Sequence, residues 1–127
     1  SVLVDSAGMS AYHVGQASDP RMQAHASRRS VDIQCISRRF DARVDFENFD
    51  YILPADEDNL AQIKKLDPEG RYRSKVLWTT DFAKRHPHLK HVPDPYYGGD
   101  EGFEQVLDLY EDVCENFIQF LRSKHQL

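Results

Sequence analysis

The fold class of this 127-residue chain follows first from residues 49–66, which read FDYILPADEDNLAQIKKL. Residues 49–53 are a short run of mostly aromatic and aliphatic side chains, which is typical of a buried strand. The residues after them form an amphipathic helix pattern, with apolar side chains at Leu60, Ile63 and Leu66. Asp67-Pro68-Glu69-Gly70 then ends the helix. A strand followed at once by a helix is the building unit of α/β proteins.

The segments on either side continue this alternation. We expect strands at 2–4, 49–53 and 75–78, helices at 20–29 and 56–66, and a helical turn at 45–48. Alternating strands and helices predict one α/β domain over residues 1–127, with a parallel sheet flanked by helices in a doubly wound arrangement. Three short strands are few for such a sheet, and the chain enters directly on a strand. We therefore expect the domain to be N-terminally incomplete, with its first strand and helix absent from this chain.

The longest predicted helix begins near Asp100, which is a suitable N-cap residue. Its apolar residues recur at i, i+3, i+4 and i+7 spacing, at Phe103, Val106, Leu107, Tyr110, Val113, Cys114, Phe117 and Leu121. This pattern predicts packing against a core and does not indicate a cofactor site. Cys114 lies within the stripe and is expected to be a small buried hydrophobic residue.

Composition excludes several classes of partner. The chain is 40% hydrophobic and 29% charged, as in ordinary globular proteins, and no apolar run approaches the roughly 20 residues of a membrane span. A formal charge of -5 argues against broad nucleic-acid binding. Cys35 and Cys114 are too few for a disulfide framework, which favours a reducing compartment, the cytoplasm.

Residues 92–99, Val-Pro-Asp-Pro-Tyr-Tyr-Gly-Gly, form the strongest functional motif. Asp94 lies between two prolines, each of which fixes its own φ and restricts the residue before it. A stiff loop of this kind suits an acid that presents one proton to one place, and the rings of Tyr96 and Tyr97 could border a flat substrate. The same residues also suit a structural turn with packed aromatic rings. An acid of this kind needs a nucleophile to serve, and none is evident in the sequence.

Residues 86–91 contain three histidines and raise the question of a metal site. A zinc site usually takes three or four donors in fixed geometry. No Cys, Asp or Glu is organised around these histidines, and Lys84, Arg85 and Lys90 flank them. We therefore interpret the segment as a solvated connection and predict neither a metal nor another cofactor.

Taken together, these segments resemble the low-molecular-weight protein tyrosine phosphatase family. The matching pieces occur in family order along nearly the whole chain, at residues 4–8, 12–15, 19–21, 37–39, 49–53, Asp56 with Asn59-Leu60, and 92–99. The Asp-Pro-Tyr-Tyr-Gly element is specific, whereas the other pieces are individually weak but collinear. The resemblance implies hydrolysis of phosphomonoesters through a phosphocysteine intermediate, on phosphotyrosine proteins or small aryl phosphates.

The resemblance also implies roles for particular residues. Asp94 would act as the general acid that protonates the leaving oxygen, and then as the base toward water. Tyr96 and Tyr97 would line the mouth of the site and contact substrate. Tyr12 matches the variable aromatic position that helps to set substrate preference.

The family's nucleophile lies in a C-x5-R loop near its N-terminus, where backbone N–H groups hold the phosphate. Neither cysteine of this chain fits that pattern, since the sixth residue after Cys35 is Asp41 and the sixth after Cys114 is Phe120. Cys35 instead replaces a histidine that the family often carries. We therefore expect the chain alone to be inactive. The missing strand would leave an unpaired sheet edge, so we also expect self-association.

Three interpretations remain open at this stage. The chain is a piece of a full phosphatase, or a non-catalytic family member that binds phosphoproteins, or a relative such as an arsenate reductase. The paired tyrosines after Asp94 favour a phosphatase over a reductase. The lack of a cysteine relay between Cys35 and Cys114 agrees with that preference.

Overall fold

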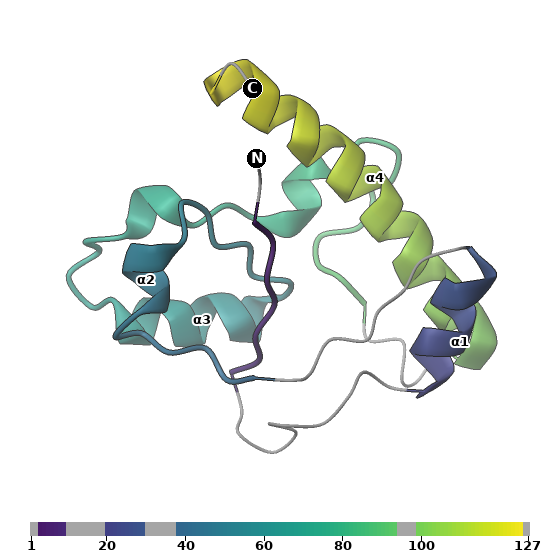
Figure 1. Cartoon of the computed structure of the whole chain (residues 1–127), viewed down its shortest axis with the longest axis horizontal. Coiled ribbons are helices and arrows are strands. Elements are labelled where there is room, and N and C mark those ends of the chain that lie inside the picture. Colours follow the sequence, from purple (N-terminus) through teal and green to yellow (C-terminus); the bar gives the residue numbers. More distant parts are fainter. Residues whose placement is uncertain (1–2, 10–19, 30–37, 94–98, 126–127) are drawn as a thin grey trace. The chain divides into compact units, whose positions relative to one another are not determined.

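The computed structural model describes residues 3–9, 20–29, 38–93 and 99–125 (Figure 1). Its elements are, in chain order, α1 (Pro20–Arg28), α2 (Asp45–Asn48), α3 (Glu57–Leu66), the 3-10 turns η1 (Arg73–Lys75) and η2 (Thr79–Phe82), and α4 (Gly99–His125). They divide into two compact units. Unit 1 contains Ser1–Phe40 and Asp94–Leu107, and unit 2 contains Asp41–Pro93 and Asp108–Leu127. The four helical segments predicted from the sequence are all present.

Local chemistry explains where α3 begins and ends. The side chain of Asp56 accepts a hydrogen bond of 2.8 Å from the N–H of Asn59, which caps the helix. After Leu66 the carboxylate of Asp67 accepts the N–H groups of Arg71 and Tyr72 at 2.9 and 3.0 Å. Gly70 adopts a φ of +68° within this turn, a conformation that glycine adopts without steric cost. The predicted helix and the break after it are therefore both confirmed.

Strand pairing occurs at two isolated positions in the described part of the chain, and both are parallel, as predicted. In unit 1, Gly8 pairs with Arg39 through the bonds Gly8 N–H to Arg38 O (2.9 Å) and Phe40 N–H to Gly8 O (2.8 Å). In unit 2, Ile52 pairs with Val76 through Ile52 N–H to Lys75 O (2.9 Å) and Leu77 N–H to Ile52 O (3.0 Å).

The predicted strands are longer than the paired positions observed. Within 49–53 and 75–78, pairing is confined to the bridge between Ile52 and Val76, because Pro54 has no N–H to donate and η1 takes up the residues before Val76. Leu3 and Val4, predicted to lie in a strand, are not in one and are each 82% exposed. Neither residue takes part in the two bridges found among the described residues.

In unit 1, α1 packs against the first turns of α4. The buried side chain of His25 contacts Glu104, with Nδ1 lying 2.5 Å from Oε2, and its ring stacks on Phe103 at 5.3 Å. The guanidinium of Arg29 binds the other oxygen of Glu104 at 2.9 Å. These two partners, Arg29 first and His25 second, lower the pKa of Glu104 below its usual value.

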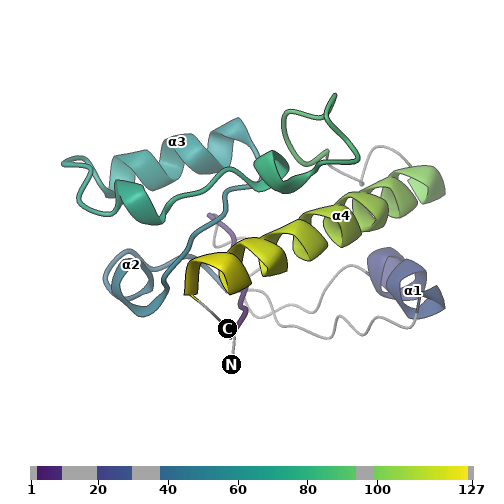
Figure 2. The ribbon, with the colours of Figure 1, turned by 90° about the horizontal axis from the view of Figure 1, so that it is seen from above.

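In unit 2, the core forms where α4 meets the segment after η2. Ala83, Leu109 and Val113 make the buried cluster, and Phe82, Leu89 and Val92 pack against it. Figure 2 shows α3 and the segment through η2 on one side of the C-terminal half of α4. The orientation of α4 is therefore set in unit 2 by contact with residues 82–92.

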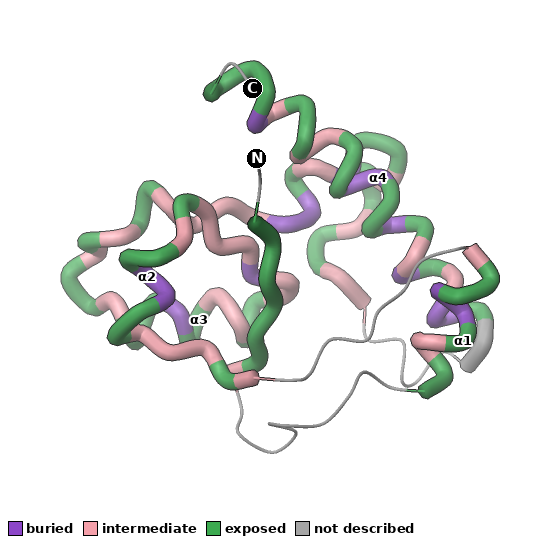
Figure 3. The backbone as a smooth tube through the Cα atoms, viewed as in Figure 1, coloured by how far each residue is buried: buried purple, intermediate pink, exposed green. Residues whose placement is uncertain are grey.

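The buried face of α4 differs from the predicted stripe. Phe103, Val106, Val113 and Leu121 are buried as expected, but Tyr110 and Cys114 are exposed. Leu109 and Asp112, which the pattern did not select, are both fully buried. Figure 3 shows that short buried segments alternate with exposed ones along α4. The correction arises because the spacing of apolar residues fits two neighbouring faces of a helix, and tertiary contact selects one of them.

Among the described residues, no helix combines the length and the apolar character that crossing a bilayer requires.

The corrected face of α4 can be tested by matched truncations. Leu109→Ala should lower the free energy of unfolding by about 3 kcal/mol, because it leaves a cavity in the core. Cys114→Ala should change the free energy by less than about 0.5 kcal/mol, as expected for an exposed position. Urea denaturation measures both. A larger loss for Cys114→Ala than for Leu109→Ala would contradict the observed buried face of α4 and support the predicted one.

Candidate functional site

The residues predicted to form the site, Tyr12, Asp94, Tyr96 and Tyr97, lie outside the described residues, as does Cys35. The structure does describe the chain that leads directly to Asp94. We call this stretch, residues 82–93, the acid-loop support. It follows η2, contains neither helix nor strand beyond Phe82, and belongs wholly to unit 2. Its shape therefore depends on local backbone turns and on contacts with other elements.

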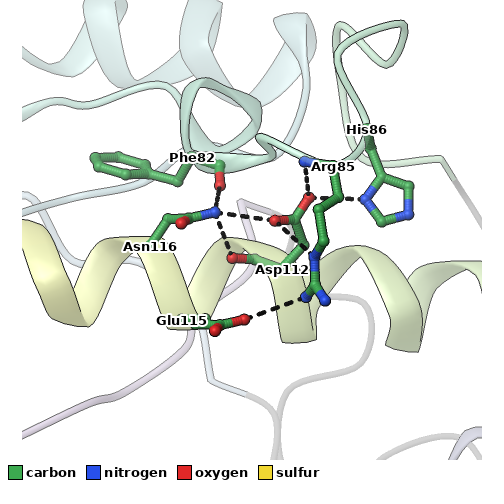
Figure 4. Close-up of polar contacts among 6 residues, drawn as sticks. All are labelled: Phe82, Arg85, His86, Asp112, Glu115 and Asn116. Carbon is green, nitrogen blue, oxygen red and sulfur yellow. Dashed lines mark hydrogen bonds and ion pairs between the residues drawn. The ribbon is translucent and has the colours of Figure 1, made fainter.

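The first part of the acid-loop support is tied to Asp112 of α4 (Figure 4). The carboxylate of Asp112 accepts the backbone N–H of Arg85 at 2.8 Å and the Nε of the same residue at 3.3 Å. Nδ1 of His86 lies 2.8 Å from Oδ2 of Asp112. Because an ionised carboxylate can only accept, Nδ1 of His86 carries the proton in this contact. Asp112 thus binds two consecutive residues of the support.

Asn116 lies one helical turn after Asp112 and binds the acid-loop support at Phe82, which precedes Arg85 in the sequence. Its Nδ2 donates to the carbonyl of Phe82 at 2.7 Å and to Oδ1 of Asp112 at 2.9 Å. The two side chains therefore form one connected network on the same face of α4. At the surface, Arg85 also pairs with Glu115 at 3.3 Å, and the side chains of that pair are 62% and 61% exposed.

The electrostatics of Asp112 reflect competing effects. Burial by itself raises the pKa of the carboxyl group, since it disfavours the charged form. The hydrogen bonds from His86 and Arg85 outweigh that effect and hold the pKa of Asp112 below its usual value. The group is therefore an ionised acceptor at neutral pH, fully enclosed by the donors that it binds.

The later part of the acid-loop support, at Lys90 and Val92, is hydrogen-bonded to residues outside α4. The indole Nε1 of Trp78 donates to the carbonyl of Lys90 at 2.7 Å. The N–H of Val92 donates to the carbonyl of Ala55 at 2.8 Å. Ala55 lies between the paired residue Ile52 and the start of α3, and Thr79 binds the neighbouring carbonyl of Pro54 at 2.6 Å. The chain is thus fixed two residues before Asp94.

The histidines of residues 86–91 do not converge. His86 is bound to Asp112, the His86 and His88 ring centres lie 6.4 Å apart, and His91 contacts its neighbour's carbonyl. In the described part of the chain, no group of three or more His, Cys, Asp or Glu is arranged to hold a metal ion. His86 is instead part of the network that holds the acid-loop support.

Cys114 is not arranged as a nucleophile. Partial desolvation of its thiol raises the pKa above the usual value, so the thiol is the protonated form at neutral pH. A cavity of about 720 Å³ lies elsewhere in unit 2, beside α3, and is lined in part by Leu60, Ile63, Lys64 and Trp78. Its described lining residues lie between Pro54 and Asp81.

Sequence reasoning missed Asp112 and Asn116. Asp112 follows Leu109 by three residues and precedes Val113 by one, so it falls on the face of α4 that is buried. That placement of an acid beside core leucine and valine was the available signal. It indicates a partner only once the buried face is known, and the sequence pattern selected the neighbouring face.

The sequence model of the family described as low molecular weight phosphotyrosine protein phosphatase matches residues 1–127. A Synechocystis protein assigned as a low molecular weight protein-tyrosine-phosphatase is 43% identical over 120 residues, covering 94% of this chain and 75% of that protein.

Two solved structures extend the comparison. A protein tyrosine phosphatase of Entamoeba histolytica, crystallised with Hepes in its active site, has a TM-score of 0.87 at 41% identity. The match covers 97% of this chain and 76% of that one. A Drosophila arginine phosphatase has a TM-score of 0.82 at 27% identity, covering 94% and 77% of the respective chains.

The architecture is therefore that of an α/β phosphatase. The chain belongs to the low molecular weight protein tyrosine phosphatase family, as its motifs indicated.

The ionisation of Asp112 generates a pH-dependent prediction. Asp112→Asn should lower the free energy of unfolding at pH 7 by about 2 kcal/mol, because hydrogen bonds to a charged group are lost. The folded pKa lies below the ordinary value of 3.8, so the stabilisation is present above that value and lost as the pH falls through the folded pKa. The difference between the two proteins should therefore be constant from pH 7 to pH 5 and shrink below pH 3.8.

Urea denaturation at several pH values measures this difference, with Glu115→Gln as a control that removes only the exposed pair with Arg85. A difference that stays the same down to pH 3 would contradict the role of the carboxylate charge.

Proposed function

We propose that this chain forms the body of a low molecular weight protein tyrosine phosphatase that hydrolyses phosphotyrosine and small aryl phosphates. The observation that carries the proposal is the Pro-Asp-Pro-Tyr-Tyr-Gly element at residues 93–98, set within a family match over residues 1–127. The firm attachment of the acid-loop support also favours it, because a general acid needs a fixed position.

The proposed reaction has two steps. A cysteine thiolate attacks phosphorus and forms an S–P bond, while the bond from phosphorus to the tyrosine oxygen breaks and Asp94 protonates that oxygen. Water then attacks the phosphocysteine, Asp94 takes up a proton from it, and inorganic phosphate and the thiolate are released. Tyr96 and Tyr97 border the aromatic group of the substrate in this proposal, and Tyr12 adjusts the choice of substrate.

The nucleophile of this reaction is outside the 127 residues, which contain no C-x5-R sequence. We therefore propose that residues 1–127 are one phosphatase-like domain that is inactive by itself and acts with a catalytic loop from an additional segment. The match covers 75% of the length of the Synechocystis relative, and this partial coverage agrees with the proposal. A cytoplasmic location is part of the same proposal.

A second candidate is a non-catalytic protein that binds phosphorylated partners, which the unsuitable cysteines favour. The Drosophila relative is described as an arginine phosphatase, so phosphoarginine is the alternative substrate to test. We also propose self-association through the exposed side chains of Leu3 and Val4.

The nucleophile proposal predicts that the 127-residue chain does not turn over a chromogenic aryl phosphate. The positive control is the extended chain, in which a family member's N-terminal catalytic unit is joined ahead of Ser1. The extended chain should hydrolyse the substrate, and parallel assays with phosphotyrosine and phosphoarginine should favour phosphotyrosine. Sustained hydrolysis by the mass-verified 127-residue chain after repurification would sink the proposal.

The acid role predicts a dependence on the leaving group. In the extended chain, Asp94→Asn should lower kcat by a factor on the order of 10²–10⁴ for phenyl phosphate, which leaves as a basic phenolate. The loss should be smaller for p-nitrophenyl phosphate, whose leaving group needs less protonation. Asp50→Asn, at an exposed carboxylate, is the matched control and should leave kcat unchanged. An equal loss on both substrates would instead assign Asp94 a structural role.

A further inference from the structure

We propose that Asp112 and Asn116 of α4 are positioning residues for the general acid, because they fix the register of the acid-loop support that continues into Asp94. The inference rests on the proposed role of Asp94 and deepens it. It concerns unit 2 and the covalent continuation of the chain from Val92 to Asp94.

The acid-loop support has no helix or strand beyond Phe82 that would hold its shape. After η2 ends at Phe82, no described residue up to Pro93 is in a helix or strand. Two backbone turns lie within it, closed by His86 N–H to Ala83 O and Leu89 N–H to His86 O, both at 3.1 Å. Four contacts with other elements hold it further. They bind the carbonyl of Phe82, the backbone and side chains of Arg85 and His86, the carbonyl of Lys90, and the N–H of Val92.

Apolar packing attaches the support to α4, whereas hydrogen bonds fix its position along the helix. Ala83, Leu89 and Val92 pack on Leu109 and Val113, and this apolar contact is non-directional. Apolar packing alone would hold the support on α4 without fixing its position along the helix. Hydrogen bonds are directional, and those of Asp112 and Asn116 join defined atoms of Phe82, Arg85 and His86 to defined positions on the helix.

A buried charged group is weak evidence for stability, because its desolvation offsets much of what its partners contribute. The best attested use of such groups is to specify one register among several. Asp112 is fully buried and accepts three bonds from the support, which is the arrangement expected of a register-setting group.

The N–H of Val92 is fixed on Ala55, Pro93 follows, and Asp94 is followed by Pro95. The ring of Pro93 fixes its φ and restricts Val92, so few backbone rotations separate Val92 from Asp94, and Pro95 restricts Asp94 itself. A shift of the support is therefore passed on to Asp94, and a misplacement of about 1 Å can cost on the order of 10² in rate.

The structural test uses the 127-residue chain and amide hydrogen exchange. Asp112→Asn should raise the exchange rate of the Arg85 N–H by roughly tenfold, the equivalent of one lost hydrogen bond. The Val92 N–H should also exchange faster, although its own acceptor is unchanged. Glu115→Ala, which removes the exposed partner of the same Arg85, should leave both rates unchanged. Unchanged exchange at Val92 in Asp112→Asn would overturn the inference.

The kinetic test uses the extended chain with two substrates. Asp112→Asn should lower kcat by about 10-fold for phenyl phosphate and by less than about 3-fold for p-nitrophenyl phosphate, with KM little changed. A purely structural loss would reduce the active fraction and lower both values equally. Asn116→Ala provides a second variant, because it removes the bond to Phe82 and the bonds to the carboxylate and backbone carbonyl of Asp112.

The outcomes distinguish a failure of the positioning role from a failure of the acid role. If Asp94→Asn depends on the leaving group and neither Asp112→Asn nor Asn116→Ala does, the positioning role is wrong and the proposed function stands. If Asp94→Asn itself lacks that dependence, the acid role fails, and the positioning role fails with it. A leaving-group dependence in all three variants, with Glu115→Ala at the wild-type value, supports the inference.

Discussion

The carboxylate of Asp112 accepts four donors inside unit 2, and three of them belong to Arg85 and His86. Its charge is retained in a buried position only because these donors compensate for the lost water. The path of the chain from η2 toward Asp94 depends on that compensation. Without it, α4 and residues 82–93 would be joined by apolar packing, by the bond from Asn116 to Phe82 and by the exposed pair of Arg85 with Glu115.

The other constraints of unit 2 act around this network. The single parallel pairing of Ile52 with Val76 brings together the two stretches that lead into α3 and η2. Pro54 and Ala55 then present carbonyl groups that Thr79 and Val92 bind. One side-chain bond, from Thr79, and one backbone bond, from Val92, therefore lie next to this pairing and add to it.

These contacts bear on the function that we propose for this family member. A phosphatase that transfers a proton to a leaving oxygen needs an acid on a stiff and well-placed loop. In the proposed function, the prolines that flank Asp94 in the sequence would provide local stiffness, and the contacts of residues 82–93 hold the chain that precedes it. The two contributions have separate origins, since the first is covalent and local whereas the second comes from residues distant in the sequence.

The sequence alone determined the helices, the turn at Asp67–Gly70, the parallel direction of pairing and the family, because these follow from local spacing, capping and collinear motifs. It also supplied the hypothesis for Asp94, Tyr12, Tyr96 and Tyr97. Only the tertiary structure decided that Leu109 and Asp112 are buried while Cys114 is exposed, and that Asn116 binds Phe82. Helical periodicity leaves two neighbouring faces almost equivalent, and the choice between them is made by partners that lie far along the chain.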